Sequence, residues 1–162
     1  MYCTRKVSIV ALIGIWTVGS ASAAEVKVSG TMTYEMEVLS RTDAGDGTSI
    51  VSVRQSGTIG DDTTAPTAID DDAQVCLGTF LMKDGEMISG QGFCDTVDQD
   101  DHRWWLSFSA VGKTSAWKVT GGTGKFKNMT GAGETSFPTV TPDSLGRDWT
   151  QKYEGVLQIQ PQ

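Results

Sequence analysis

Hydrophobic and polar residues alternate along much of this chain, which is the pattern of β-strands. From residue 26 to residue 38 the even positions are apolar or small, and the odd positions are polar or charged. The even positions hold Val26, Val28, Gly30, Met32, Tyr34, Met36 and Val38. Because successive side chains of a strand point to opposite faces, this segment is predicted to be a half-buried strand.

Seven further strands are predicted, at about 49–58, 74–82, 87–95, 103–110, 114–120, 131–136 and 149–159. No segment shows a convincing helical period. Short strands joined by glycine-rich turns predict an all-β sandwich or closed barrel, and closure removes the exposed sheet edges. An antiparallel barrel of eight strands has room inside for side chains or for one small ligand.

Two long segments between the predicted strands are expected to be loops. Residues 40–48 contain Asp43, Gly45, Asp46 and Gly47, and they are predicted to form a flexible hairpin tip. Residues 60–73 are acidic and rich in threonine, a composition that favours a solvated or disordered segment.

Aromatic residues on the predicted strands are the candidate ligand-binding residues. They are Tyr34, Trp104, Phe108, Trp117, Trp149 and Tyr153. Most aromatic residues in such a chain pack in the core. A barrel lined by Trp and Tyr can also hold a small apolar or aromatic ligand, with a few polar groups that orient it. Both roles stay open, because the volume of a cavity cannot be read from a sequence.

Cys76 and Cys94 are predicted to form a cross-strand disulfide. They lie nine residues on either side of Gly85, within the hairpin signal Lys83-Asp84-Gly85-Glu86. A loop with an odd number of residues centred on Gly85 places the cysteines directly opposite each other. A two-residue loop leaves them one step out of register, and a β-bulge then has to correct the pairing. A zinc site is a poor alternative, because no further ligands lie at zinc spacing.

Residues 1–23 are predicted to be a secretory signal peptide. Arg5 and Lys6 precede an apolar run at 7–18, and the small residues Ala21-Ser22-Ala23 follow it. Cleavage after Ala23 leaves a single β-barrel domain at residues 24–162. The apolar run is short for a span of about 20 residues, so no membrane span is expected after cleavage. The predicted location is secreted or periplasmic, where a pair of cysteines can be oxidised.

The charge of the chain restricts its partners. The full chain has 13 basic and 20 acidic residues, a formal net charge of -7. Removal of Arg5 and Lys6 with the signal peptide leaves 11 basic and 20 acidic residues, a net charge of -9. An acidic surface without a basic stripe argues against binding to nucleic acid and to anionic membrane surfaces.

A glycine-rich segment at 117–133 is predicted to link two strands through a turn. Gly121, Gly122 and Gly124 allow the backbone to take positive φ there. Phe126 and Met129 are the large apolar residues of the turn, and they are expected to fold over one open end of the sheet.

No cofactor is predicted for the chain. A dinucleotide-binding motif needs G-x-G-x-x-G, but counting from Gly122 places Lys127 at the third glycine position. A phosphate loop needs Ser or Thr after its lysine, and here Phe126 follows Lys125. Both nucleotide-binding motifs are therefore broken.

The run Gly121-Gly122-Thr123-Gly124-Lys125-Phe126, followed by Gly131-x-Gly133, resembles the signature of the allene oxide cyclase-like barrels. This group includes the dirigent proteins and many secreted bacterial proteins of unknown role. The segment from Gly92-Phe93-Cys94-Asp95 to Trp105 resembles the cysteine-then-acidic segment of the bacterial members. Together the matches cover roughly residues 74–136, and the resemblance implies a barrel rather than a sandwich.

The resemblance implies two kinds of chemistry. Plant allene oxide cyclases close an unsaturated epoxide to a cyclopentenone without a cofactor, using barrel shape, a buried carboxylate and ordered water. Dirigent proteins steer the coupling or cyclisation of phenolic intermediates, and they form oligomers, so an oligomer is left open here. No catalytic residue of either group transfers to this chain, because the matched segments hold none.

An acidic turn contains Asp95, Asp98, Asp100, Asp101 and His102. Carboxylates at short spacing suit a hard cation, but the EF-hand pattern is not met. A solvated turn is the favoured interpretation, with no metal assigned.

His102 is the only histidine and so the obvious general base. No nucleophile elbow G-x-S-x-G accompanies it, so a surface histidine is favoured and the catalytic residues are unknown.

Three functions are consistent with these features. The first is a secreted small β-barrel that binds a small hydrophobic or aromatic molecule. The second is a cofactor-independent cyclase or isomerase of the allene oxide cyclase type, which holds a reactive conformer and excludes water. The third is a structural or surface-interaction protein with a filled barrel. An ionisable group in the cavity with a raised carboxyl pKa would favour the enzyme. A dry apolar cavity would favour ligand binding. A filled interior would favour the structural or surface-interaction protein.

Overall fold

A computed structural model describes residues 23–62, 68–136 and 149–159. The predicted signal peptide lies outside the described residues except for Ala23. Across the described ranges, no helix is both long and apolar enough to cross a membrane.

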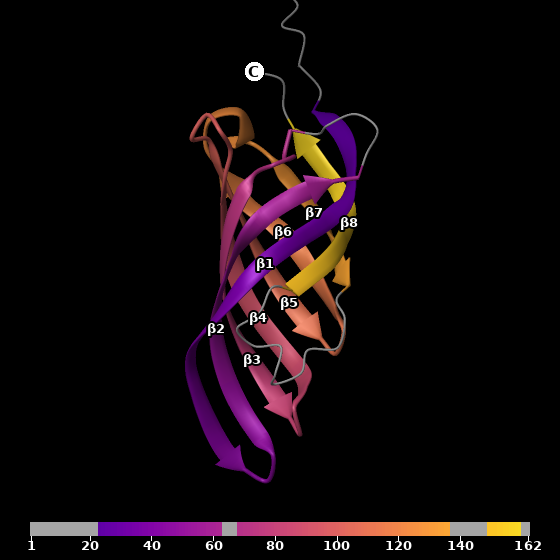
Figure 1. Ribbon diagram of the computed structural model, residues 1–162. Helices are drawn as coiled ribbons and strands as arrows, with labels where there is room; N and C mark the ends of the chain where they lie inside the picture. The colour runs from indigo at the N-terminus through magenta and orange to yellow at the C-terminus, as the bar shows by residue number, and fades with distance from the viewer. Residues whose placement is uncertain (1–22, 63–67, 137–148, 160–162) are drawn as a thin grey trace, which may run out of the picture.

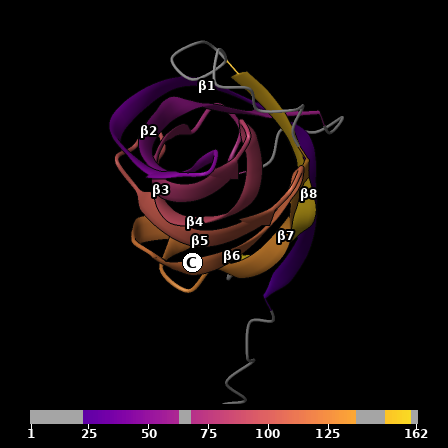
Figure 2. The ribbon, with the colours of Figure 1, turned by 90° about the horizontal axis from the view of Figure 1, so that it is seen from below.

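Eight antiparallel strands form a closed barrel in which the strands follow one another in chain order (Figure 1). Seen along its axis in Figure 2, the barrel encloses its interior on all sides. The strands are β1 (Ala24–Gly45), β2 (Thr48–Asp61), β3 (Ala73–Lys83), β4 (Glu86–Val97), β5 (Arg103–Val111), β6 (Thr114–Gly122), β7 (Thr130–Ser136) and β8 (Trp149–Ile159). β8 closes the ring because it pairs with both β1 and β7. The all-β fold predicted from the alternation is confirmed, and so is the barrel that the family resemblance implied.

β1 and β2 continue beyond the start of β8 as a long hairpin, at the lower end in Figure 1. The hairpin tip lies within the predicted residues 40–48, but the long loop expected there is wrong, because pairing continues to Gly45, which lies opposite Thr48. Asp46 and Gly47 make the turn, with φ of 51° and 80°. The tip is supported by the β3–β4 hairpin, whose Lys83 Nζ lies 3.2 Å from Asp46 Oδ2.

The β3–β4 hairpin brings the two cysteines together. A two-residue turn joins the strands, with Asp84 at φ 51° and Gly85 at φ 84°. A β-bulge between Leu81 and Met82 shifts the register, so that Cys76 lies opposite Cys94. The predicted disulfide between them is confirmed, through the second of the two register alternatives.

The segment between β2 and β3 is packed against the barrel where the structure describes it. Ile69 is 2% exposed and Asp72 is 3% exposed. The backbone N–H of Asp71 donates to Ile59 O at 2.9 Å, and the N–H of Ile59 donates to Asp72 O at 3.0 Å. The prediction of a solvated segment was wrong for these residues. It rested on the overall polar composition of the segment, which does not show that one isoleucine, Ile69, packs in the core.

Two apolar clusters fill the barrel. The larger cluster includes Val28, Tyr34, Ile59, Trp104, Trp117, Phe126 and Leu157. The smaller cluster lies toward the end with the β1–β2 and β3–β4 hairpins, and it consists of Met36, Val51, Val53, Met82, Met87 and Ala110. Most of these residues occupy inward positions of the alternating strands, and Ile69, Phe126 and Met129 join the larger cluster from the connecting segments.

The glycine-rich segment covers the other end of the barrel. A short 3-10 helix, η1 (Gly124–Phe126), carries Phe126, which is 0% exposed, and Met129 follows at 3%. Of the three glycines of the predicted turn, Gly124 has a positive φ, of 50°. Gly121 and Gly122 belong to β6, and a Cβ at Gly122 would lie 2.5 Å from Phe126 O. Gly122 thus lets the returning chain lie directly against the strand.

Candidate functional site

The barrel encloses a cavity of about 60 Å³, which residues of both apolar clusters line. Its apolar wall includes Met32, Ile59, Phe80, Leu106, Phe108 and Trp117. Its polar groups come from Tyr34, Gln55, Gln74, Ser115, Thr135, Gln151 and Tyr153. Among the described residues, no Asp, Glu, Lys, Arg or His lines this cavity. The site is therefore an apolar chamber with neutral hydrogen-bonding groups.

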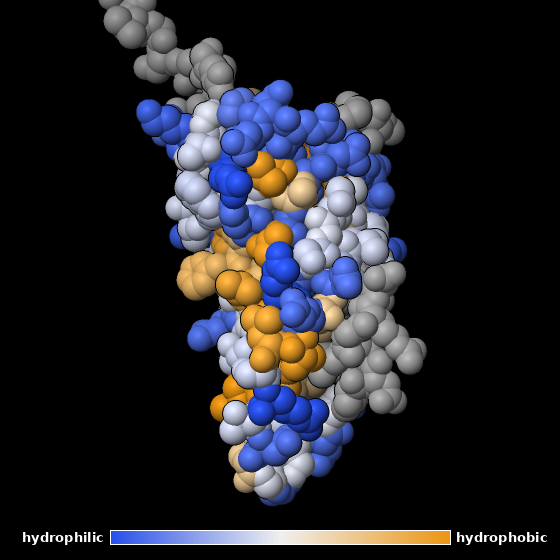
Figure 3. Space-filling model, turned by 60° about the vertical axis from the view of Figure 1, so that its left-hand side comes forward, coloured by the Kyte–Doolittle hydropathy of each residue, from blue (hydrophilic) through white to orange (hydrophobic). Residues whose placement is uncertain are grey.

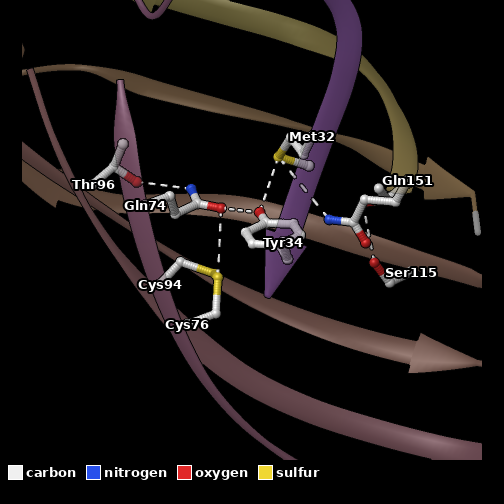
Figure 4. The surroundings of a disulfide bond; sticks show 9 residues. Met32, Tyr34, Gln74, Cys76, Cys94, Thr96, Ser115 and Gln151 are labelled. Carbon is white, nitrogen blue, oxygen red and sulfur yellow. Dashed lines mark hydrogen bonds between the residues drawn. A yellow bond between two sulfur atoms is a disulfide. The ribbon is translucent and has the colours of Figure 1, made fainter. Parts of the chain in front are cut away.

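A chain of hydrogen bonds orients Tyr34 at the cavity wall (Figure 4). Its hydroxyl donates to Gln74 Oε1, and Gln74 Nε2 donates to Thr96 Oγ1 at 2.8 Å. The same amide oxygen lies 3.4 Å from Cys76 Sγ of the disulfide. Burial raises the pKa of Tyr34, so the phenol stays protonated at neutral pH. The disulfide hairpin thus fixes the glutamine that orients the tyrosine.

Five of the six predicted aromatic residues line this one cavity: Tyr34, Trp104, Phe108, Trp117 and Tyr153. Four are buried, and Phe108 is half-buried. Trp149 begins β8 opposite Tyr34, and its side chain lies outside the described residues. Tyr153 donates its hydroxyl proton to Gly60 O at 3.2 Å, which ties β8 to the end of β2.

Phe80 is a cavity residue that sequence reasoning missed. Its ring stacks on Phe108 with 6.2 Å between centroids and 24° between planes. Glycines make room for the pair, since a Cβ at Gly90 would lie 2.2 Å from the Phe80 ring and one at Gly92 2.6 Å from the Phe108 ring. The signal in the sequence was the repeat of glycine at the inward positions of two paired strands, Gly78 on β3 with Gly90 and Gly92 on β4.

Asp72 is a buried carboxyl behind the cavity wall. It is 3% exposed, and its Oδ2 accepts a hydrogen bond from Trp104 Nε1 at 2.9 Å. Burial raises the pKa of Asp72 to about 6, although the bond from Trp104 and the charge of Lys125 act to lower it. The negative charges of Asp98 and Asp70 raise it as well. Trp104 lines the cavity, so the carboxyl is linked to the cavity through the indole.

Asp72→Asn is expected to stabilise the protein by on the order of 2 kcal/mol near pH 7.5, and by much less near pH 4. The folded pKa lies above the ordinary value of 3.8, so the folded state holds this proton more tightly than the unfolded chain. That contribution is lost as the pH rises from about 4 through 6. Asparagine keeps an acceptor for Trp104 and does not ionise.

Urea unfolding of both proteins at the two pH values measures this difference. Asp71→Asn is the control, because Asp71 is exposed in the same segment. The control is expected to change the free energy of unfolding by less than about 0.5 kcal/mol at either pH. An effect of Asp72→Asn that is the same at both pH values would contradict the assigned cause.

The acidic turn is held by an ion pair. Lys125 Nζ lies 2.8 Å from Asp98 Oδ2, and His102 Nδ1 lies 3.4 Å from the same oxygen. Burial raises the pKa of Asp98, but the interactions with Lys125 and with the backbone N–H groups of His102 and Asp100 outweigh it, so this pKa lies below its usual value. Ligand atoms of Asp98, Asp100 and His102 lie within 4.8 Å of one another. Because the Lys125 ammonium already neutralises Asp98, the geometry favours a structural turn over a cation site.

No family model and no curated protein matches the sequence. Solved structures do match it. The pterocarpan synthase dirigent protein GePTS1 has a TM-score of 0.53 at 15% sequence identity, over 93% of this chain and 100% of that one. The pterocarpan synthase dirigent protein PsPTS1 has a TM-score of 0.56 at 13% identity, over 87% of this chain and 99% of that one.

This chain has the dirigent-protein fold. The resemblance to the allene oxide cyclase-like and dirigent-like barrels is confirmed at the level of the fold, since identities of 13% and 15% show the fold alone. One fold supports many functions. The function of this dirigent-like barrel therefore depends on the side chains that line its interior and its outer surface.

Proposed function

We propose that this protein binds a small hydrophobic or aromatic molecule inside the barrel. The observation that carries the proposal is the apolar cavity, which six aromatic side chains line together with neutral polar groups. Ligand sites are commonly apolar chambers with a few polar groups that fix orientation. Gln55, Gln151 and the Tyr34 hydroxyl are such groups here, and they suit a ligand with a hydroxyl or carbonyl.

The size of the cavity limits the ligand. A volume of about 60 Å³ suits a few water molecules, whereas a known cavity that accepts benzene measures about 150 Å³. A ring-sized ligand therefore requires movement of side chains. Phe80 and Phe108 are the best candidates to move, because both are only half-buried and both lie on glycine backbone.

A cofactor-independent cyclase or isomerase is the second candidate function. The feature that favours it is Asp72, whose pKa is raised to about 6 by burial and whose carboxyl accepts a bond from the cavity residue Trp104. Perturbed carboxyl groups of this kind concentrate at functional sites. The carboxyl does not line the cavity, however, so binding is the primary proposal.

A secreted or periplasmic location is part of the proposal. The barrel carries a buried disulfide, which fits an oxidising compartment. The pattern at residues 1–23 is that of a signal peptide. In that location the protein would meet its apolar ligand outside the cytoplasm.

Native mass spectrometry of the protein from its own source tests the binding proposal, together with melting of the purified protein with small phenols and indoles. A retained compound, or a melting temperature raised by a few degrees by one probe class, is expected. Phe108→Ala enlarges the chamber and is expected to increase that shift, because it removes a cavity side chain. The control Phe93→Ala removes a 68% exposed ring from the outer surface and should leave the shift unchanged.

If only Phe108→Ala responds to the probes, the native chamber is filled, and the third function is favoured. If neither protein responds and no compound is retained, the binding proposal is wrong. The enzyme is distinguished by Asp72→Asn, which should abolish turnover of a bound compound without releasing it.

A further inference from the structure

Gln55 is a buried residue whose amide stands outside the hydrogen-bond network around Tyr34. Its side chain lines the cavity, and the residue is 5% exposed. Within residues 23–62, 68–136 and 149–159, the Gln55 side chain forms no hydrogen bond with another residue. An amide that leaves water without gaining a partner costs free energy. Its presence therefore calls for a reason other than packing.

The inward residues at the level of Gln55 are otherwise apolar. The residues paired at this level across β1 to β6 are Met36, Gln55, Cys76, Cys94, Leu106 and Val119. All six are buried. The two cysteines form the disulfide, so neither offers a thiol proton to the amide. A methionine at position 55 would fill the same space without burying a polar group.

A second glutamine, Gln74, shows how a structural amide is held in this barrel. At the adjacent level, Tyr34 pairs with Gly57, and Gly57 pairs with Gln74. A Cβ at Gly57 would lie 2.8 Å from Tyr34 Cδ1, so the glycine lets the tyrosine reach across β2. Both ends of the Gln74 amide are bonded, because Oε1 accepts from Tyr34 and Nε2 donates to Thr96 at 2.8 Å (Figure 4). Gln74 thus joins strands, whereas Gln55 presents its amide to the cavity.

The level on the other side of Gln55 offers a flat apolar place for a ring. There Gly78 pairs with Gly92, and Gly92 pairs with Phe108. A Cβ at Gly78 would lie 3.0 Å from the Phe108 ring, and one at Gly92 2.6 Å from it. Gln55 pairs with Cys76, two residues before Gly78, so Gln55 and Gly78 are diagonal neighbours on the inner face. A ligand ring that takes the place of Phe108 can therefore direct a substituent toward Gln55.

We propose that Gln55 selects the ligand, by pairing with an uncharged carboxamide or lactam carried on a small aromatic ring. The inference rests on the proposed binding function and adds the chemistry of the ligand's polar group. The Gln55 amide accepts through Oε1 and donates through Nε2. A carboxamide or lactam places a donor beside an acceptor, so it satisfies both atoms at once.

The cavity disfavours a charged ligand. A carboxylate only accepts hydrogen bonds, so it would leave Gln55 Oε1 without a donor. Among the described residues, no Lys, Arg or His lines the cavity to neutralise such a charge. Burial of an unpaired charge is far more costly than burial of a neutral amide. A carboxamide is therefore expected to bind where the carboxylate of the same ring does not.

The outer surface is a second place where an aromatic probe can associate. Figure 3 shows apolar side chains between the polar ends of the molecule, and Leu77 and Phe93 are 55% and 68% exposed. Association there depends on apolar area and not on Gln55. A comparison of ligands that share one ring and differ in the polar group separates the two places.

NMR titration of the purified protein with benzamide, acetophenone and benzoate tests the inference. Benzamide is expected to bind about tenfold more tightly than acetophenone, which accepts a hydrogen bond but donates none. Benzoate should not bind. Gln55→Met keeps a similar shape without the amide and should remove the preference for benzamide. The control Leu77→Ser changes an exposed outer residue and should keep it.

The melting temperatures of two glutamine variants give a second readout. Gln55→Met should melt no lower than the native protein, because it removes an amide that has no protein partner. Gln74→Met should melt several degrees lower, because Tyr34 and Thr96 both lose their partner. If Gln55→Met loses as much as Gln74→Met, Gln55 has a structural role and the inference is wrong.

Failure of this inference can be distinguished from failure of the binding proposal. If the native protein binds phenols or indoles but does not prefer benzamide to acetophenone, the inference is wrong and ligand binding stands. The same conclusion follows if Gln55→Met retains the preference. If no aromatic probe binds to the native protein, the binding proposal fails and this inference fails with it.

Discussion

Phe126→Ala is expected to lower the free energy of unfolding by about 3–5 kcal/mol. The ring is 0% exposed and seals the barrel end beside Trp104, with 6.3 Å between the two centroids. Its removal deletes buried surface and leaves a cavity that cannot collapse easily, because the backbone of β6 lies directly beside it at Gly122. Urea unfolding followed by tryptophan fluorescence measures the change.

Phe93→Ala is the matched control for this substitution. The residue type is the same, but its side chain is 68% exposed on the outer wall of β4. In dilute solution, Phe93→Ala should lower the free energy of unfolding by less than about 1 kcal/mol. If Phe126→Ala costs no more than the control, the turn after β6 does not seal the barrel as the structure indicates.

Removal of the disulfide by Cys76→Ala with Cys94→Ala is expected to cost about 3 kcal/mol. The bond joins residues 18 apart in sequence, and it restricts the unfolded chain. The cysteines also hold Gln74, whose amide oxygen contacts Cys76 Sγ at 3.4 Å and accepts a bond from Tyr34. Loss of the pair should therefore also loosen the wall of the cavity.

Guanidinium unfolding with and without dithiothreitol measures the contribution of the disulfide. The reductant should destabilise the native protein by nearly the amount that the double substitution does. It should leave the double variant unchanged, because that variant has no bond to reduce. A native protein that keeps its full stability after complete reduction would show that the barrel does not depend on the disulfide.

The strand pattern could be predicted because it depends on local alternation. Val28, Met32, Tyr34 and Met36 point inward in β1 as their parity predicts. The disulfide could be predicted because hairpin geometry links nearby residues, although the sequence left two registers open. The bulge beside Met82 decided between them.

The candidate site was only partly predictable. Five aromatic residues on different strands converge on one cavity, which follows from parity once the sheet closes. Phe80 and Gln74 were missed, since their roles depend on partners across the barrel: Phe108 for the first, and Tyr34 with Thr96 for the second. These contacts join residues far apart in the chain, and no local pattern records them.

Asp72 shows the same limit in a charged residue. In the sequence it is one of several aspartates in a polar segment, but in the fold it is buried under Trp104. Ile69 packs in the core, and the Asp72 carboxyl three residues later is buried in the same segment. Burial and neighbouring charges set a pKa, and both depend on three-dimensional packing.

Alternation, turn residues and cysteine spacing in the sequence by themselves determined an all-β chain with a disulfide hairpin, because each reflects contacts between residues close in sequence. The tertiary structure alone decided how wide the interior is and which polar groups face it. It also decided which apolar residues stay outside: Phe93 and Leu77 lie on the outer wall while Phe80 and Phe108 lie within. Closure of the barrel sets these features, and closure depends on the register of all eight strands together.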